Sequence, residues 1–226
     1  MSQPEQQINQ KDFLRFVHER QALKFGEFKT KSGRLSPYFF NAGGLYKGSD
    51  LIQLGQAYAQ AIHDAFGDDI DMIYGPAYKG ITLAAIICTE LQRSFGCDVA
   101  YRFNRKEAKD HGEKGLFVGK APEKGDRIVI VDDVITAGTS IRETMELLRK
   151  IDGLDVRGIL VAIDRQEKAT GKDMSAVQEV EAEYGLPVKS ITSIQGILEH
   201  LDDDTFGDLS PELCQKIKGY RNQYGV

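Results

Sequence analysis

Two adjacent carboxylates and a run of small and hydroxyl residues follow a stretch of branched apolar residues. Asp132 and Asp133 come directly after Ile128–Val131, and a turn over residues 136–140 leads into an expected helix. Carboxylates accept hydrogen bonds from sugar hydroxyls, and backbone N–H groups at a helix N-terminus bind phosphate. Gly138 lets the backbone approach a ligand closely. The stretch therefore predicts a sugar-phosphate site, although two acids after a strand can also simply cap a loop.

The elements that must position this turn alternate between strands and helices. Hydrophobic patterns predict strands at 71–74, 98–103, 127–131, 156–163 and 187–191. They predict helices at 10–23, 49–66, 80–94, 139–150 and 174–184, with two more at the C-terminus. Residues 25–41 are expected to form short extended segments around a turn. The alternation indicates an α/β fold, a mainly parallel sheet flanked by helices, with ligands at the carboxyl ends of the strands.

Composition limits the class of protein. The chain has 226 residues, enough for one domain, and no linker or repeat divides it. Its 29 basic and 34 acidic residues give a net charge of −5, which argues against a nucleic-acid partner. Cys88, Cys97 and Cys214 fit neither a zinc pattern nor a disulfide framework. With no apolar signal or membrane-spanning segment, we expect a cytoplasmic protein without a membrane partner.

Residues 128–140 resemble the PRPP motif of the type I phosphoribosyltransferases, where PRPP is phosphoribosyl pyrophosphate. That motif is a hydrophobic strand, two acids and a Thr-Ala/Gly-Gly-Thr turn. The chain carries no Gly-x-Gly-x-x-Gly and no Walker-A string, so dinucleotide and P-loop sites have little support. The resemblance implies the type I phosphoribosyltransferase fold. It also implies a single domain over residues 1–226, in which residues about 1–45 contribute a small base-binding hood.

Four further segments, at 23–41, 75–80, 103–112 and 164–167, resemble the orotate branch of that family. They imply transfer of the 5-phosphoribosyl group from PRPP to N1 of orotate, as in pyrimidine (UMP) biosynthesis. The implied PRPP contacts are Lys31, Tyr78, Lys79, Arg105, Lys106, Lys109, His111, Asp132, Asp133, Val134, Ile135, Thr136, Ala137, Gly138, Thr139 and Ser140. The implied orotate contacts are Phe39, Phe40, Thr136 and Arg165. The implied catalytic residues are Lys109, His111, Asp132 and Asp133.

The 103–112 segment is the most diagnostic of the four. It places four potential cations, Arg105, Lys106, Lys109 and His111, in one polar loop. Such a loop is usually only solvated, but its Lys-Glu-x-Lys-x-His pattern matches the family's catalytic loop. Cations that arrive on closure can stabilise the charge of a departing pyrophosphate and exclude water.

The other segments have simpler alternatives. The Phe39-Phe40 pair could pack into the core, where an aromatic hairpin is common, instead of covering a pyrimidine. Arg165 could form a surface pair with a glutamate instead of gripping the orotate carboxylate with two hydrogen bonds. In the 75–80 segment the resemblance implies a cis peptide bond between Ala77 and Tyr78.

The resemblance also implies a cofactor and an assembly. Mg2+ is expected to bind mainly through PRPP oxygens and water, with no dedicated protein ligands. A homodimer is expected, in which Lys106 reaches the partner's site. Two alternatives are a phosphoribosyltransferase for another base and a non-catalytic regulator. The loop pattern and Arg165 argue against the first, and the retained loop cations argue against the second.

Overall fold

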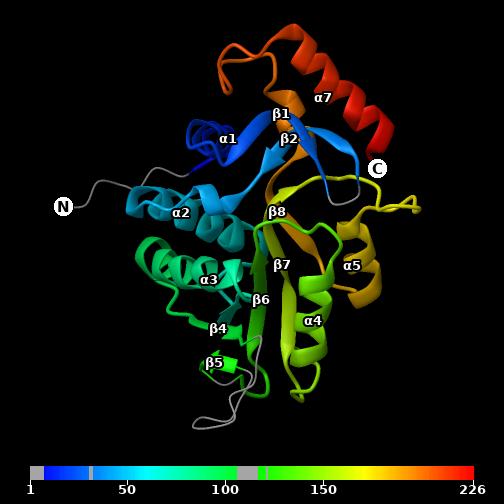
Figure 1. Cartoon of the computed structure of the whole chain (residues 1–226). Coiled ribbons are helices and arrows are strands. Elements are labelled where there is room, and N and C mark those ends of the chain that lie inside the picture. Colours follow the sequence, from blue (N-terminus) through cyan, green and yellow to red (C-terminus); the bar gives the residue numbers. More distant parts are fainter. Residues whose placement is uncertain (1–7, 31–32, 106–116, 121) are drawn as a thin grey trace, which may run out of the picture.

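The computed structural model describes residues 8–30, 33–105, 117–120 and 122–226. A six-stranded sheet forms its centre, in the order β5-β4-β3-β6-β7-β8 (Figure 1). Its strands are β3 (Met72–Tyr74), β4 (Ala100–Asn104), β5 (Phe117–Gly119), β6 (Arg127–Asp132), β7 (Asp155–Asp164) and β8 (Val188–Ser193). Every neighbouring pair is parallel except β4–β5. The predicted mainly parallel α/β sheet is confirmed.

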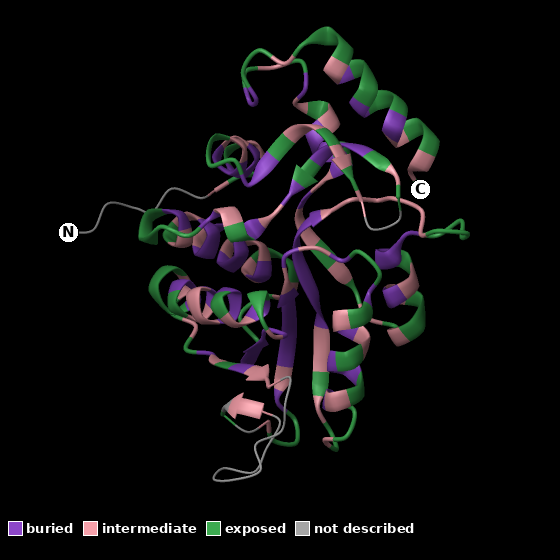
Figure 2. Cartoon of the chain, in the orientation of Figure 1, coloured by how far each residue is buried: buried purple, intermediate pink, exposed green. Residues whose placement is uncertain are grey.

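Helices cover both faces of this sheet, as the alternating pattern predicted. The helices are α1 (Gln10–Glu19), α2 (Gly48–Phe66), α3 (Lys79–Glu90), α4 (Thr139–Leu148), α5 (Ala176–Tyr184), α6 (Ile194–Glu199) and α7 (Pro211–Tyr224). On one face, Val129 and Val131 of β6 pack in a cluster with α2 and α3. On the other, Ile128 and Ile130 pack in a cluster with α4 and α5. The strands are therefore buried on both sides, and Figure 2 shows β6 and β7 as a continuous buried centre.

A second, two-stranded sheet stands apart from the main one. Strands β1 (Leu23–Lys29) and β2 (Leu35–Phe40) pair antiparallel. Figure 1 places them above β8, between α1 and α7. Tyr38 and Leu23 are fully buried and belong to the same core cluster as Ile217 of α7. The N-terminal strands and the C-terminal helix therefore pack as one layer over one end of the main sheet.

Several element boundaries differ from those predicted. The first helix ends at Glu19 instead of residue 23, because Gln21 takes a positive φ of 59° and the chain turns into β1. The second helix begins at Gly48, and Asp50 caps it from inside the first turn by accepting a bond from the Lys47 amide at 3.2 Å. The predicted helix over 80–94 begins at Lys79 and becomes a π-helical turn over Leu91–Phe95.

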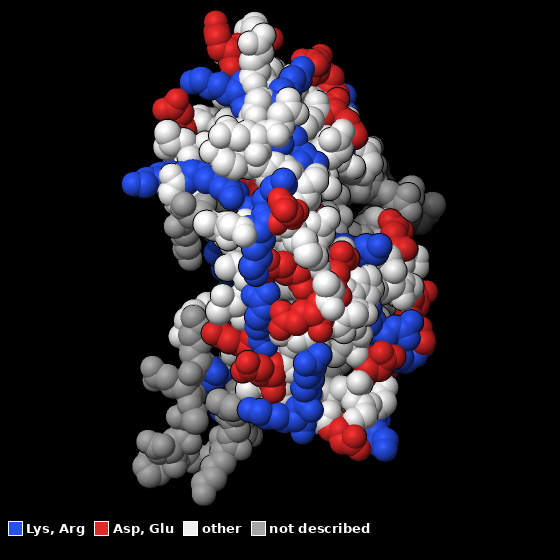
Figure 3. All heavy atoms as spheres, turned by 90° about the vertical axis from the view of Figure 1, so that its right-hand side faces the viewer, with Lys and Arg blue, Asp and Glu red and all other residues white. Residues whose placement is uncertain are grey.

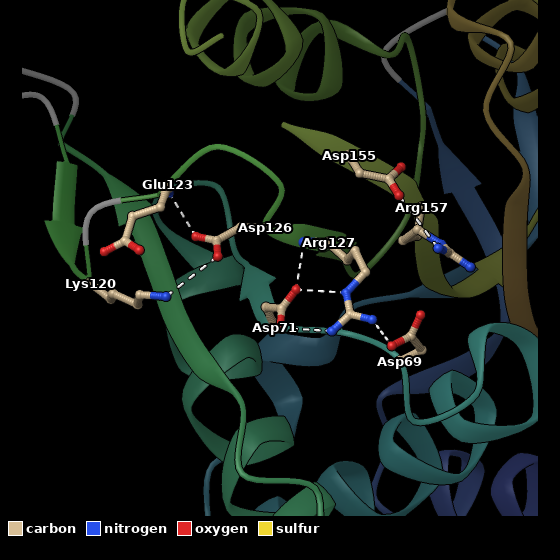
Figure 4. A network of polar contacts seen from close by, with 8 residues as sticks. All are labelled: Asp69, Asp71, Lys120, Glu123, Asp126, Arg127, Asp155 and Arg157. Atoms are coloured by element: carbon tan, nitrogen blue, oxygen red, sulfur yellow. Dashed lines mark hydrogen bonds and ion pairs between the residues drawn. The ribbon is translucent and has the colours of Figure 1, made fainter. Parts of the chain in front are cut away.

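Ion pairs hold the amino ends of the strands together, at the edge opposite to the predicted site (Figure 4). The Arg127 guanidinium donates from Nε and Nη2 to the two oxygens of Asp71 at 2.7 and 2.9 Å, and it also contacts Asp69. Such a two-pronged pair favours one geometry. It ties the segment before β3 to the first residue of β6, and so supports the pairing of the two central strands.

Among the described residues, none of the helices combines the length and apolar character that crossing a bilayer requires. The face in Figure 3, seen from the right-hand side of Figure 1, carries acidic and basic side chains interspersed. Among the ion pairs of the structure, Arg142 pairs with Glu183 at 2.7 Å, and Lys172 pairs with Glu179 at 2.7 Å. This face offers no continuous basic surface to a polyanion.

Candidate active site

The sequence motifs meet at the carboxyl ends of four neighbouring strands. The 75–80 turn follows β3, the acid pair closes β6, Asn104 ends β4, and Asp164-Arg165 ends β7. Because β4, β3, β6 and β7 are consecutive in the sheet, their carboxyl ends share one edge. This is the edge at which parallel α/β sheets bind ligands. The structure therefore brings Tyr78, Lys79, the 132–140 segment and Arg165 to one edge, whereas Phe39 and Phe40 lie on β2 of the separate two-stranded sheet.

The turn over residues 136–140, predicted to bind a phosphate, has the geometry of an anion cradle. Thr136 and Ala137 are exposed, Gly138 takes a left-handed φ of 72°, and α4 begins at Thr139. Arg142 donates to the Ala137 carbonyl at 2.6 Å, which fixes the orientation of that peptide. Amides at the start of α4 are thus left to face a ligand, as the first N–H groups of a helix are.

Two predicted PRPP contacts can act only through their backbones. Ile135 is 7% exposed and packs in the cluster with α4 and α5. Val134 is half-buried and packs against the cluster on the other face. Their side chains hold the turn between the two layers, which leaves their peptide groups to border the site.

The acid pair is asymmetric. Asp133 is 5% exposed and accepts a short bond from Lys79 Nζ at 2.5 Å. Asp132 forms no ion pair within the described part of the chain, and burial together with the Asp133 charge raises its pKa to about 6, although the nearby Lys79 charge opposes the rise. Hydrogen bonds from the Asp133 amide, at 2.9 Å, and from Ser140 oppose that rise. Asp132 is therefore the carboxylate that most needs donors from a ligand.

The turn after β3 depends on two glycines in backbone contact. A Cβ on Gly75 would overlap the carbonyl oxygen of Gly80, so neither position admits a side chain without displacement. The peptide bond between Ala77 and Tyr78 is cis, as predicted. Asn104 accepts from the Ala77 amide and from the Tyr74 hydroxyl, each at 3.3 Å. Asn104, at the end of β4, thus holds the turn in place through hydrogen bonds. Helix α3 starts within the turn, at Lys79.

The segment after β2 reaches the same edge through Asn41. Lys79 Nζ donates to Asn41 Oδ1 at 3.2 Å in addition to its bond with Asp133. Phe40 is 6% exposed and packs in the core, which agrees with the alternative that the Phe39-Phe40 pair is part of the core. Phe39, in contrast, is 42% exposed and stacks on Phe28. Phe39 alone of the pair presents its ring at the surface.

Arg165 does pair with a glutamate, but not at the surface. Its Nε and Nη2 donate to Glu167 Oε1 at 3.0 and 2.7 Å, and the two side chains are 18% and 14% exposed. Nη2 also donates to Ser36 at 3.1 Å, which ties β2 to the end of β7. The guanidinium lies over the Tyr38 ring, 4.7 Å from its centroid. Arg165 therefore lies between the hood and the main sheet.

Four predicted residues, Lys31, Lys106, Lys109 and His111, lie outside the described residues. Arg105 follows β4 and is half-buried. Sequence reasoning missed Asn41, Asn104 and Glu167 as supports, although each stands inside or beside a quoted motif. It also missed Tyr220, which no motif marks. No group of three His, Cys, Asp or Glu side chains suited to a metal occurs among the described residues.

Comparisons with known proteins agree on one family. The model of the phosphoribosyl transferase domain matches residues 42–191. Orotate phosphoribosyltransferase of Pseudomonas fluorescens (strain SBW25) is 50% identical over 223 residues, covering 97% of this chain and 100% of the relative. The corresponding protein of Polynucleobacter asymbioticus is 51% identical over 222 residues, covering 96% and 97%.

Solved structures agree with this result. The orotate phosphoribosyltransferase of Francisella tularensis superposes with a TM-score of 0.83 at 40% identity, covering 95% of this chain and 99% of that one. Leishmania donovani UMP synthase, at 22% identity, shares the fold with a TM-score of 0.72 over 94% of this chain and 42% of its own. The chain belongs to the orotate phosphoribosyltransferases, a branch of the phosphoribosyltransferase family.

Proposed function

We propose that the chain catalyses its family's reaction with the residues assembled at this edge. The 5-phosphoribosyl group passes from PRPP to N1 of orotate, giving orotidine 5′-phosphate and pyrophosphate, a step of pyrimidine (UMP) biosynthesis. The observation that carries the proposal is the meeting of four motifs at one sheet edge: the acid pair, the phosphate turn, the glycine-bounded turn and Arg165.

PRPP would bind along this edge. Its 5′-phosphate would lie in the 136–140 turn, held by backbone amides and by the hydroxyls of Thr136, Thr139 and Ser140. Its ribose hydroxyls would donate to Asp132 and Asp133. Hydrogen bonds from a sugar suit Asp132, because burial and the Asp133 charge raise its pKa and each added donor favours the charged form.

Orotate would bind between the hood and Arg165. The Arg165 guanidinium would take the orotate carboxylate, and Phe39, Phe40 and Thr136 would border the ring. Since Phe40 packs into the core, its contribution would come from the backbone. Attack of N1 on C1 of the ribose passes through an oxocarbenium-like state with inversion, and the acid pair stabilises its positive charge.

Cations would hold the departing pyrophosphate. Tyr78 and Lys79 lie on the glycine-bounded turn, and Lys31, Arg105, Lys106, Lys109 and His111 are assigned by resemblance. Lys79 would exchange its Asp133 partner, in part, for pyrophosphate oxygens. Charge on the pyrophosphate is further neutralised by Mg2+, which on this proposal binds mainly through PRPP and water.

The proposal also covers the domain organisation, the assembly and the location of the chain. The chain would form one domain over residues 1–226, with residues about 1–45 as the base-binding hood, and the packing of β1 and β2 with α7 supports this. It would act as a homodimer in which Lys106 reaches the partner's site. Adjacent side chains on an extended segment point to opposite sides, so Arg105 and Lys106 could serve different sites. The cysteines, all free, support a cytoplasmic location.

Base preference tests this proposal. The wild-type protein should prefer orotate over uracil, the base without the carboxylate, by roughly 30-fold or more in kcat/KM, since a charge-assisted contact contributes about 2 kcal/mol or more. Arg165→Ala should remove most of that preference. Steady-state rates with both bases measure it. Arg157→Ala, on the same strand but at its amino end, is the matched control. Comparable kcat/KM values for the two bases in the wild-type protein would contradict the assignment of Arg165.

A further inference from the structure

The Glu167 carboxylate lies at the centre of a mostly buried polar cluster, of which the proposed reaction uses only Arg165. Its Oε1 accepts from the Tyr38 hydroxyl at 2.7 Å and from Arg165, and its Oε2 accepts from the Tyr220 hydroxyl at 3.0 Å. Ser36 and Tyr38 are 1% and 0% exposed, and Tyr220 is 7% exposed. We call these five residues, Ser36, Tyr38, Arg165, Glu167 and Tyr220, the Glu167 cluster.

The cluster joins three segments that lie far apart in the sequence. Ser36 and Tyr38 come from β2, Glu167 follows β7, and Tyr220 belongs to α7. The general phosphoribosyl transferase match, residues 42–191, leaves out β2 and α7, whereas the orotate relatives cover nearly the whole chain. Residues outside the shared domain are where features specific to one base are expected. The cluster connects two such segments to the arginine proposed to bind the base.

Both tyrosines are held as hydrogen-bond donors. Burial raises the pKa of Tyr38 well above its usual value, and it raises the pKa of Tyr220 as well. Neither hydroxyl therefore ionises near neutral pH, so both donate to Glu167. A carboxylate with two fixed donors and a cation has little freedom to turn. The Tyr220 ring also packs edge-on against the Tyr38 ring, at 6.2 Å between centroids.

The contacts of Arg165 leave one part of its guanidinium available. Nε and Nη2 are occupied by Glu167 and Ser36. Among the described residues, Nη1 has no hydrogen-bond partner. A guanidinium is planar and rigid, so fixing Nε and Nη2 also fixes the direction in which Nη1 points. Glu167 thus determines which N–H groups remain for a ligand carboxylate.

We propose that Glu167, held by Tyr38 and by Tyr220 of the C-terminal helix, is a positioning residue that presents Arg165 to the carboxylate of the base. This inference rests on the proposed role of Arg165. It gives α7 a function in base recognition, because Tyr220 is the contact through which that helix reaches Arg165.

Two conservative variants test the inference. Tyr220→Phe removes one hydroxyl and keeps the ring, and Glu167→Gln keeps the size of the side chain but removes its charge. Tyr224→Phe is the matched control, since Tyr224 lies on the same helix and its ring packs at a tilt against Tyr220, with centroids 4.9 Å apart, but it is outside the cluster. For each protein the measurements are kcat, the KM values for orotate and PRPP, kcat/KM with uracil, and the thermal midpoint.

Both variants should raise the KM for orotate by roughly 5- to 20-fold, since each weakens a hydrogen bond to a charged group. The KM for PRPP and kcat/KM with uracil should stay within about 2-fold, because neither involves the carboxylate of the base. Tyr224→Phe should match the wild-type protein. In an Arg165→Ala background, Tyr220→Phe should change orotate kinetics by less than about 2-fold, because the two residues act through one contact.

Other outcomes would overturn the inference. Equal losses with orotate and PRPP, or an undiminished effect of Tyr220→Phe in the Arg165→Ala background, would mean that the cluster only stabilises the fold. If Arg165→Ala keeps the full preference for orotate, the proposed function of Arg165 fails and the positioning role falls with it. If Arg165→Ala loses the preference while Tyr220→Phe and Glu167→Gln keep it, the positioning role alone is wrong.

Discussion

Replacing Lys109 by alanine is expected to lower turnover by roughly 100- to 1000-fold, the loss typical of a group that stabilises transition-state charge. PRPP affinity should change by only a few fold, because a cation that acts on loop closure contributes little to the ground state. Lys109 lies outside the described residues, and its role is assigned from the Lys-Glu-x-Lys-x-His pattern. Among the described residues, Lys79 is already engaged by Asp133 and Asn41, so further cations are needed for a pyrophosphate.

Turnover and PRPP binding must be measured separately for this variant. Steady-state kinetics gives kcat, and calorimetric titration with PRPP and Mg2+ gives the dissociation constant. Lys189→Ala, an exposed lysine on β8, is the matched control and should behave as wild type. If PRPP affinity collapses while turnover survives, Lys109 anchors the substrate in the ground state instead.

Asp132→Asn is expected to lower activity and to stabilise the fold. Activity should fall by roughly 100-fold, since the variant removes a preorganised charge beside the reacting ribose. The stability gain follows from the raised pKa, about 6, which shows that folding places the Asp132 charge in an unfavourable environment. Asparagine keeps an oxygen that can accept from the Asp133 amide but carries no charge.

The gain should depend on pH. Asp132 has a pKa of about 6 in the folded chain and a usual value of 3.8, so the folded state holds the proton more tightly. Its contribution to stability is therefore present at low pH and is lost as pH rises from about 4 to 6. From this difference between the two pKa values, Asp132→Asn should gain roughly 1–3 kcal/mol of unfolding free energy near pH 7.5. Near pH 4.5 it should gain less than about half of that.

Denaturant unfolding of the wild-type and variant proteins at both pH values measures this gain. Asp155→Asn removes a carboxylate at the amino end of β7, 53% exposed, and is the matched control. It should show no comparable gain at either pH. A loss of stability for Asp132→Asn near neutral pH would contradict the assignment of Asp132 as a charge held unfavourably for function.

Much of the fold could be predicted because its signals are local. Four branched residues before the acid pair predicted β6, and the small-residue turn predicted the start of α4 at Thr139. The short antiparallel edge strand β5 was not predicted, because its three residues follow a polar stretch of sequence and carry no periodic pattern. Its pairing with β4 is a long-range contact that only the folded chain reveals.

The candidate site also divides into residues that local motifs predicted and residues that only the folded structure revealed. Asp132, Asp133, Tyr78, Lys79 and Arg165 were assigned from motifs whose residues are contiguous in sequence. The supports of those residues come from elsewhere: Asn41 from the end of the hood, Asn104 from β4, and Tyr220 from α7. These hydrogen bonds join residues 27, 38 and 53 positions apart, and contacts over such distances leave no pattern in the sequence, so they required the structure.

The central claim is most directly tested by incubating the purified protein with orotate, PRPP and Mg2+ and following both products. The account predicts that orotate disappears while orotidine 5′-phosphate and pyrophosphate form in equal amounts, and that the reaction stops when PRPP or Mg2+ is omitted. Unchanged orotate, or pyrophosphate released without a nucleotide product, would contradict it.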